Sequence, residues 1–105
     1  MTNKTFVVRY ETKDADAANA NQRLVEAVFA ELNADDPGGL RYATFRLADG
    51  VTFVHVAVHE TEKNVLEDSA AFRDFQKTIA ERVAGPPSFS EATLVGSYRF
   101  LTPGA

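Results

Sequence analysis

Two runs of alternating hydrophobic and polar residues flank the dipeptide Asp49-Gly50 and form the clearest pattern in the chain. An Asp-Gly pair between two such runs predicts a β-hairpin, because a type I′ turn needs positive φ at both central residues. The predicted hairpin spans residues 42–59. Its turn sets a register whose opposed pairs are Ala48–Val51, Leu47–Thr52, Arg46–Phe53, Phe45–Val54, Thr44–His55, Ala43–Val56 and Tyr42–Ala57.

This register divides the hairpin into two faces, because successive side chains of a strand point to opposite sides of a sheet. One face is apolar, and we expect helices to cover it: Ala43, Phe45, Leu47, Val54 and Val56. The other face mixes aromatic, charged and hydroxyl side chains, and we expect it to stay uncovered: Tyr42, Thr44, Arg46, Phe53, His55 and Ala57. The mixed face is therefore the predicted location of function.

The residues before the hairpin predict a strand and a helix. Phe6–Glu11 is rich in β-branched and aromatic residues and predicts a strand, with Val7 and Arg9 on its uncovered face. Asp14 or Asp16 is the predicted N-cap of the helix that follows. The helix is predicted over 17–32 from an apolar stripe at helical spacing, formed by Ala17, Ala20, Leu24, Ala27, Val28 and Leu32.

The residues after the hairpin predict a short helical turn at Val65–Asp68 and then a second long helix capped by Ser69. Gly85, followed by two prolines, is expected to end that helix. Glu91–Phe100 is the predicted last strand, and Thr102–Ala105 a loose tail. The apolar stripe of the second helix consists of Phe72, Phe75, Ile79 and Val83.

The predicted order is therefore β-α-β-β-α-β within a single domain of residues 1–105. Each helix has one apolar stripe, so both helices should cover the same face of a four-stranded antiparallel sheet. Right-handed crossovers then give the strand order 4-1-3-2 of a ferredoxin-like α+β sandwich.

Composition narrows the function classes. The net charge of −4 disfavours polyanionic partners, so we expect no nucleic acid to bind. The absence of cysteine excludes disulfides and thiolate chemistry. No signal-like or membrane-spanning run is present, so we expect a cytoplasmic protein without a membrane partner. His55 and His59 lie about 13 Å apart on an extended strand, and we expect no metal and no cofactor.

The predicted uncovered face should be buried against a second molecule. Together with Val7, the residues Tyr42, Phe53 and Ala57 make an apolar patch that a monomer rarely exposes. The simplest partner is a second copy across a two-fold axis, which gives a homodimer. Two such sheets face to face would form a barrel with Arg9, Arg46 and His55 inside it or at its rim.

The element order resembles that of the dimeric α/β-barrel superfamily, which includes the antibiotic-biosynthesis monooxygenases. The segment Ser69–Phe75 is similar to the start of that family's second helix, where a serine precedes an aromatic-x-x-aromatic stripe. The chain departs from the family's motif at Leu66, Ala70 and Ala71, and it has no tryptophan. The resemblance implies a dimeric α/β barrel and, for an active member, oxygenation of a small aromatic compound without a cofactor.

The candidate site residues all lie on or beside the mixed face. His55 is the candidate catalytic base, because its ordinary pKa lies near physiological pH. Arg9 and Arg46 are candidates for stabilising an anion, and Tyr42 and Phe53 for forming an apolar wall. Each has a structural alternative: a hydrogen-bonded buried histidine, an intersubunit ion pair, or ordinary core packing.

Two functions therefore stay open from sequence. One is a homodimer that binds a small apolar or aromatic molecule and acts as a monooxygenase-like enzyme. The other is a non-catalytic dimer that binds a ligand or a partner, in which His55 has no cavity beside it. RNA binding, suggested by a motif-like run from Gly50 to Val56, is disfavoured by the missing basic and aromatic positions and by the net charge.

Overall fold

The computed structural model describes residues 3–101. Its elements are β1 (Lys4–Glu11), α1 (Ala15–Asp35), β2 (Leu40–Arg46), β3 (Thr52–His59), the 3-10 turn η1 (Val65–Asp68), α2 (Ala70–Thr78), the 3-10 turn η2 (Ile79–Glu81) and β4 (Ser88–Ala92). This order confirms the predicted β-α-β-β-α-β pattern. The predicted tail at 102–105 lies outside the described residues.

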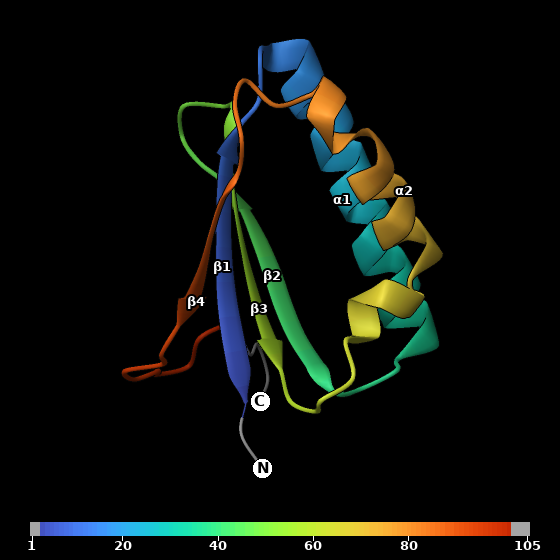
Figure 1. Ribbon diagram of the computed structural model, residues 1–105, viewed down its shortest axis with the longest axis vertical. Helices are drawn as coiled ribbons and strands as arrows, with labels where there is room; N and C mark the ends of the chain where they lie inside the picture. The colour runs from blue at the N-terminus through green and yellow to red at the C-terminus, as the bar shows by residue number, and fades with distance from the viewer. Residues whose placement is uncertain (1–2, 102–105) are drawn as a thin grey trace.

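The strands form one antiparallel sheet in the order β2-β3-β1-β4, which is the predicted order 4-1-3-2 read from the other edge. Both helices lie on the same side of this sheet (Figure 1). The ferredoxin-like sandwich is therefore confirmed. Among residues 3–101, no helix combines the length and the apolar character needed to span a membrane.

The hairpin has the predicted register, but its turn differs from the predicted type. Tyr42 pairs with Ala57, Thr44 with His55 and Arg46 with Phe53. Gly50 has a φ of 81°, whereas Asp49 does not have a positive φ, so the turn is not type I′. The Gly50 amide donates to the Leu47 carbonyl and the Leu47 amide donates to the Thr52 carbonyl, so a four-residue loop, 48–51, joins the strands. The Asp49 carboxylate accepts hydrogen bonds from the Val51 and Thr52 amides, which holds the turn.

The first helix begins where predicted, but it is rotated about its axis. Asp14 is the N-cap, and its carboxylate accepts a hydrogen bond from the Ala17 amide. The buried residues of α1 are Ala18, Asn21, Val25 and Val28; of the predicted stripe, Val28 is buried and Leu24 and Leu32 pack against the core, whereas Ala17, Ala20 and Ala27 do not. A polar residue, Asn21, lies on the buried stripe, which hid this face from a search for apolar spacing.

The second helix is capped by Ser69 as predicted, but it is shorter than predicted. It ends at Thr78, and a 3-10 turn continues to Glu81. The side chain of Arg82 folds back against the end of the helix, where it donates to the Phe75 carbonyl and to the Thr78 hydroxyl. The Phe75 carbonyl would accept from the Ile79 amide if the α-helix continued. Here it accepts from Arg82, and the Ile79 amide donates to the Gln76 carbonyl instead.

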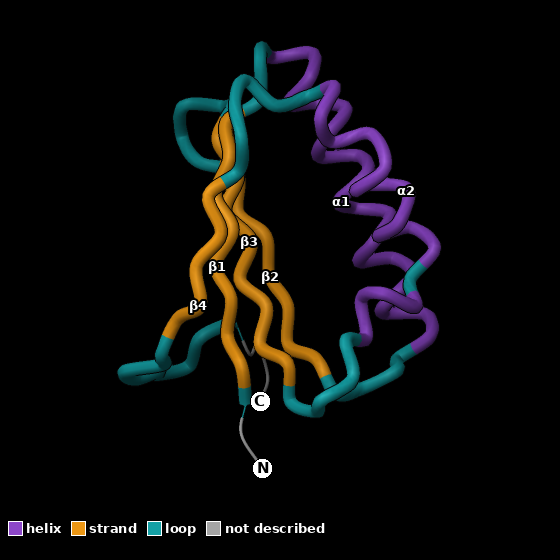
Figure 2. The backbone as a smooth tube through the Cα atoms, in the orientation of Figure 1, coloured by secondary structure: helices purple, strands orange, loops and turns teal. Residues whose placement is uncertain are grey.

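The last strand is Ser88–Ala92, so the prediction of a strand over Glu91–Phe100 is wrong apart from its first two residues. Ala92 pairs with Thr5, and β1 begins one residue earlier, at Lys4. Residues beyond 92 therefore have almost no neighbouring strand with which to pair. They leave the sheet at β4 and turn back towards it (Figure 2).

The predicted assignment of the hairpin faces is wrong, because the helices cover the mixed face. Phe53 and His55 are 1% and 5% exposed, and Tyr10 from β1 is 4% exposed. The faces of β1 are as predicted: Tyr10 pairs with Phe53, whereas Arg9 pairs with Val54 on the uncovered face. The register between β1 and β3 joins the mixed hairpin face to the aromatic face of β1, and a hairpin pattern alone does not contain that register.

Candidate functional site

His55 lies at the centre of a buried hydrogen-bond network between the sheet and the helices. Its Nε2 atom is 2.7 Å from the Tyr10 hydroxyl oxygen. Its Nδ1 atom is 2.7 Å from the Tyr42 hydroxyl oxygen and 3.1 Å from that of Thr44. Both ring nitrogens are therefore paired with hydroxyl groups. The Tyr10 hydroxyl comes from β1, those of Tyr42 and Thr44 come from β2, and His55 itself lies on β3.

The network continues into the helical layer. The Asn21 side-chain amide of α1 donates to the Tyr10 hydroxyl at 2.8 Å. The Asn21 carbonyl oxygen accepts from Nε of Arg82 at 2.9 Å. Arg82 is 6% exposed, and its hydrogen-bond acceptors among the described residues are neutral: Asn21, Thr78 and the Phe75 carbonyl. The chain of contacts thus runs from a buried cation to the edge strand β2.

Burial sets the protonation of this network. It lowers the pKa of His55 from 6.5 to about 4, so the imidazole is neutral at pH 7. Burial also raises the pKa of Tyr42 to about 12, an effect that a hydrogen bond from Thr44 partly opposes. It raises the pKa of Tyr10 as well, although the hydrogen bond from Asn21 acts in the opposite direction. At neutral pH the network therefore consists of neutral side chains that end at one guanidinium cation.

Aromatic rings surround the network. Tyr10 stacks on Phe53 with centroids 5.7 Å apart, and Phe75 of α2 lies 5.6 Å from His55. Tyr42 stacks on Phe29 of α1 at 4.9 Å. Small-molecule sites are usually lined by apolar and aromatic side chains with a few fixed polar groups, as this network is.

The structure brings together four of the five predicted site residues. Tyr42, Phe53 and His55 share the helix-covered face with Arg46, whose guanidinium lies 5.7 Å from the Phe53 ring centroid. Arg46 donates to the Gly50 carbonyl and to Asn19 and Gln22 on α1. Arg9 instead lies exposed on the opposite face, so it cannot line the same site within one chain.

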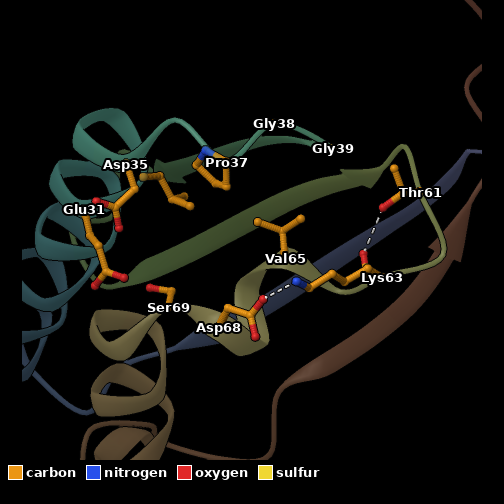
Figure 3. Close-up of a pocket in the computed structure, with 11 residues that line it drawn as sticks. Glu31, Asp35, Pro37, Gly38, Gly39, Thr61, Lys63, Val65, Asp68 and Ser69 are labelled. Carbon is orange, nitrogen blue, oxygen red and sulfur yellow. Dashed lines mark hydrogen bonds and ion pairs between the residues drawn. The ribbon is translucent and has the colours of Figure 1, made fainter.

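A pocket of about 270 Å³ lies at one end of the sandwich, where α1 ends and η1 begins. Figure 3 shows Glu31 and Asp35 on one side of this pocket, with Thr61 and Lys63 on the other. None of the predicted site residues lines it. Leu32 does line it, and Leu32 comes one helical turn after Phe29, which stacks on Tyr42. The pocket therefore lies near the Tyr42 end of the network.

Sequence reasoning missed three members of the network: Tyr10, Asn21 and Arg82. Tyr10 lies within the predicted strand Phe6–Glu11, but nothing in the sequence links it to His55. Asn21 gives a usable signal, because Ala18, Asn21, Val25 and Val28 follow helical spacing with one polar member. Arg82 gives no such signal, since a basic residue near the end of a helix is ordinary.

No family model and no curated protein matches the sequence. Solved structures do match the fold. A candidate antibiotic biosynthesis monooxygenase from Nitrosomonas europaea is 20% identical over 89% of this chain and 90% of its own, with a TM-score of 0.71. SnoaB, a cofactor-independent oxygenase from Streptomyces nogalater, is 17% identical over 92% of this chain and 97% of its own, with a TM-score of 0.65.

Rv0793 from Mycobacterium tuberculosis is similar as well, at 19% identity over 91% of this chain and 98% of its own, with a TM-score of 0.70. These identities are low, so the matches establish a shared architecture. The resemblance to antibiotic-biosynthesis-monooxygenase-like proteins is thereby confirmed at the level of the fold.

Proposed function

We propose that this protein is a homodimer that binds a small apolar or aromatic molecule between its sheet and its helices. The observation that carries the proposal is the Tyr10–His55–Tyr42 arrangement, a neutral imidazole between two phenol hydroxyls among aromatic rings. These groups combine flat apolar contact area with oriented hydrogen bonding. That combination suits a small ring-containing ligand.

The uncovered face of the sheet supports the homodimer. Beside Thr5 and Arg9, it carries apolar side chains that lie outside the core cluster: Val7, Ala43, Phe45, Val54, Val56 and Val58. The exposed large hydrophobic residues of the described chain all lie in β4 or after it: Phe89, Leu94, Val95, Tyr98, Phe100 and Leu101. A second copy is the partner that would cover both features symmetrically.

A monooxygenase-like reaction without a cofactor is the chemistry that the shared fold favours within this proposal. SnoaB, which has this fold, is described as such an oxygenase. Here His55 would be the proton-transfer group, acting through a hydroxyl because both of its ring nitrogens are already bonded. Arg46 would supply positive charge, and Phe53 and Tyr42 would form the apolar wall. Arg9 would belong to the dimer contact.

A non-catalytic binding protein is the second candidate function. The observation that favours it is the completeness of the network: His55 is 5% exposed, and the pocket does not reach it. In that case the Tyr–His–Tyr arrangement stabilises the sandwich, and the ligand or partner binds elsewhere.

Native mass spectrometry of protein freshly purified from its own host tests ligand binding. The expected result is a retained small molecule that the variant Thr61→Trp loses, because the indole would block the rim of the pocket. Glu62→Trp is the matched control, since Glu62 is exposed and does not line the pocket. A bare polypeptide mass for the wild type, with no binding from a panel of bicyclic aromatic compounds, would contradict the proposal.

Sedimentation velocity tests the homodimer. The wild type should sediment as a dimer at micromolar concentration, and Val56→Lys should sediment as a folded monomer, because it buries a charge at the centre of the uncovered face. Ala30→Lys is the control, as it adds the same charge on the exposed side of α1. A monomeric wild type would remove the role given to the uncovered face.

A further inference from the structure

We infer that the hydrogen bonds of the buried network all donate in one direction, from Arg82 towards Tyr42. This direction leaves the Tyr42 hydroxyl with one spare proton, which it can donate to an acceptor oxygen of the ligand. This inference rests on the proposed function and narrows it. The ligand would be a small ring compound with a carbonyl or similar oxygen. Tyr42 would contact it, and His55 would be a positioning residue behind Tyr42.

The direction is fixed first at Arg82. A guanidinium has only hydrogen-bond donors, so the atom of Asn21 that faces Arg82 must be its carbonyl oxygen. The Asn21 NH₂ group then faces Tyr10 and can only donate. The Tyr10 oxygen therefore accepts a hydrogen bond from Asn21, which leaves the Tyr10 proton to find an acceptor.

The described structure contains one acceptor for the Tyr10 proton, Nε2 of His55 at 2.7 Å. If Nε2 accepts, the neutral ring has its proton on Nδ1, and Nδ1 donates to Tyr42. The opposite tautomer would leave the Tyr10 proton unpaired. A network of two phenols and one neutral imidazole thus has one unpaired proton, either on Tyr10 or on Tyr42.

Burial decides between these two positions. Tyr10 is 4% exposed, and an unpaired proton there would carry the full cost of desolvation. Tyr42 is only partly buried and lies on the edge strand β2. With the ring proton on Nδ1, the Tyr42 oxygen accepts from His55, and Thr44 Oγ1 bonds to the same Nδ1, so the Tyr42 proton has no acceptor within the network. The spare donor is therefore at Tyr42.

The position of Tyr42 fits a ligand contact. It stacks on Phe29, one helical turn before the pocket residue Leu32. The hydrogen bonds behind it all donate towards it, beginning at the Arg82 cation, and such a chain strengthens each successive donor. Because this hydroxyl donates its proton, it favours a ligand oxygen with negative charge and disfavours a positively charged group.

The tautomer of His55 tests the direction without any ligand. In ¹⁵N NMR of the imidazole rings, assigned with a His59→Gln variant, we expect His55 to be protonated on Nδ1 and not on Nε2. The variant Tyr10→Phe removes the donor to Nε2, so the population protonated on Nε2 should rise. A wild-type ring protonated on Nε2 would place the spare proton on Tyr10 and overturn the inference.

A matched pair of probes tests the ligand contact. α-Tetralone and tetralin have nearly the same shape, and only the former has a carbonyl oxygen. NMR titration should show the wild type binding the ketone about tenfold more tightly than the hydrocarbon, the worth of about one hydrogen bond. Tyr42→Phe should lose this preference and keep its affinity for tetralin, whereas Tyr98→Phe, at an exposed tyrosine, should change neither.

A preference for the ketone that survives in Tyr42→Phe would overturn the inference. Failure of the proposed function would be recognised separately, because then neither probe would bind the wild type. In that case the ¹⁵N measurement would still decide whether the spare proton lies on Tyr42.

Discussion

The two faces of the sheet differ in a way that reverses the usual expectation. The helix-covered face contains His55, two tyrosine hydroxyls and, from the helical layer, a buried arginine. The uncovered face has an apolar centre, where Val7, Val54 and Val56 are adjacent across neighbouring strands β1 and β3, and Arg9 lies beside it. The polar face is thus the interior of the sandwich, and the apolar face is its surface.

The comparison shows that polar side chains are compatible with a core when each group has a partner. His55, Tyr10 and Asn21 supply one another with donors and acceptors, so their burial leaves few unpaired groups. Apolar side chains on the uncovered face cannot be stabilised by pairing with one another in this way, because apolar area is removed from water only when something covers it. In this chain that need points to a second copy.

The largest expected effect is on stability, when a ring is deleted from the covered face. Phe53→Ala should lower the free energy of unfolding by about 3–5 kcal/mol, because it leaves a cavity beside Tyr10. Phe45→Ala deletes the same atoms on the uncovered face and should cost less than half as much. Urea unfolding at one fixed protein concentration measures both. Equal losses would mean that the two faces contribute equally to the fold.

The second effect is a loss of stability in acid. Because burial lowers the pKa of His55 from 6.5 to about 4, the unfolded chain binds the proton first. Stability is therefore complete above pH 6.5 and falls as the pH drops from 6.5 to 4, by about 3 kcal/mol in all. Urea unfolding across this range should show the slope in the wild type and a flatter line in His55→Gln. Parallel lines would show that His55 is not the residue responsible.

The third effect concerns the link between the helices and the sheet. Asn21→Leu removes the partner of both the Tyr10 oxygen and Arg82 Nε, and should cost about 1–3 kcal/mol. Asn33→Leu makes the same change on the exposed side of α1 and should stay within about 0.5 kcal/mol of the wild type. Thermal unfolding of both variants gives the comparison. A neutral Asn21→Leu would show that the covered face does not need its polar network.

The smallest effect is expected at the edge of the network. Tyr42→Phe removes one of the two hydroxyls bonded to His55 Nδ1 and should cost about 1 kcal/mol, since Thr44 remains as a partner. Tyr10→Phe should cost more, because its hydroxyl joins Asn21 to His55 at a buried position. Chemical denaturation of the two variants ranks them. The reverse order would contradict the greater burial of Tyr10.

Local patterns predicted much of this architecture. The register of the hairpin depends on residues close in sequence, and it was correct down to the pairing of Thr44 with His55. The helix caps Asp14 and Ser69 were likewise predictable, because a cap satisfies amides within its own first turn. The right strand order followed from the apolar stripes of the helices, although only Leu24, Val28 and Leu32 of the predicted α1 stripe pack in the core.

The candidate site was predictable only in part. His55, Tyr42, Phe53 and Arg46 could be grouped from the alternation of one hairpin, and the structure places them on one face. Arg9 could not be separated from them, since its face depends on how β1 pairs with β3. Tyr10, the partner of His55 across the sheet, lies 45 positions from it in the chain, and Arg82 lies 61 positions from its partner Asn21, so no local pattern connects them.

The sequence by itself determined the order of the elements, the hairpin register and the division of the hairpin into an apolar and a mixed face. These features depend on backbone geometry and on interactions within a few residues. Only the tertiary structure decided which face the helices cover, because the polar groups of that face are paired by residues of distant elements: Arg82 bonds to Asn21, Asn21 to Tyr10, and Tyr10 to His55. The hydrophobic pattern of a strand indicates how much apolar area a face would bury. Whether the polar groups of that face find hydrogen-bond partners depends on residues that only the folded chain brings together.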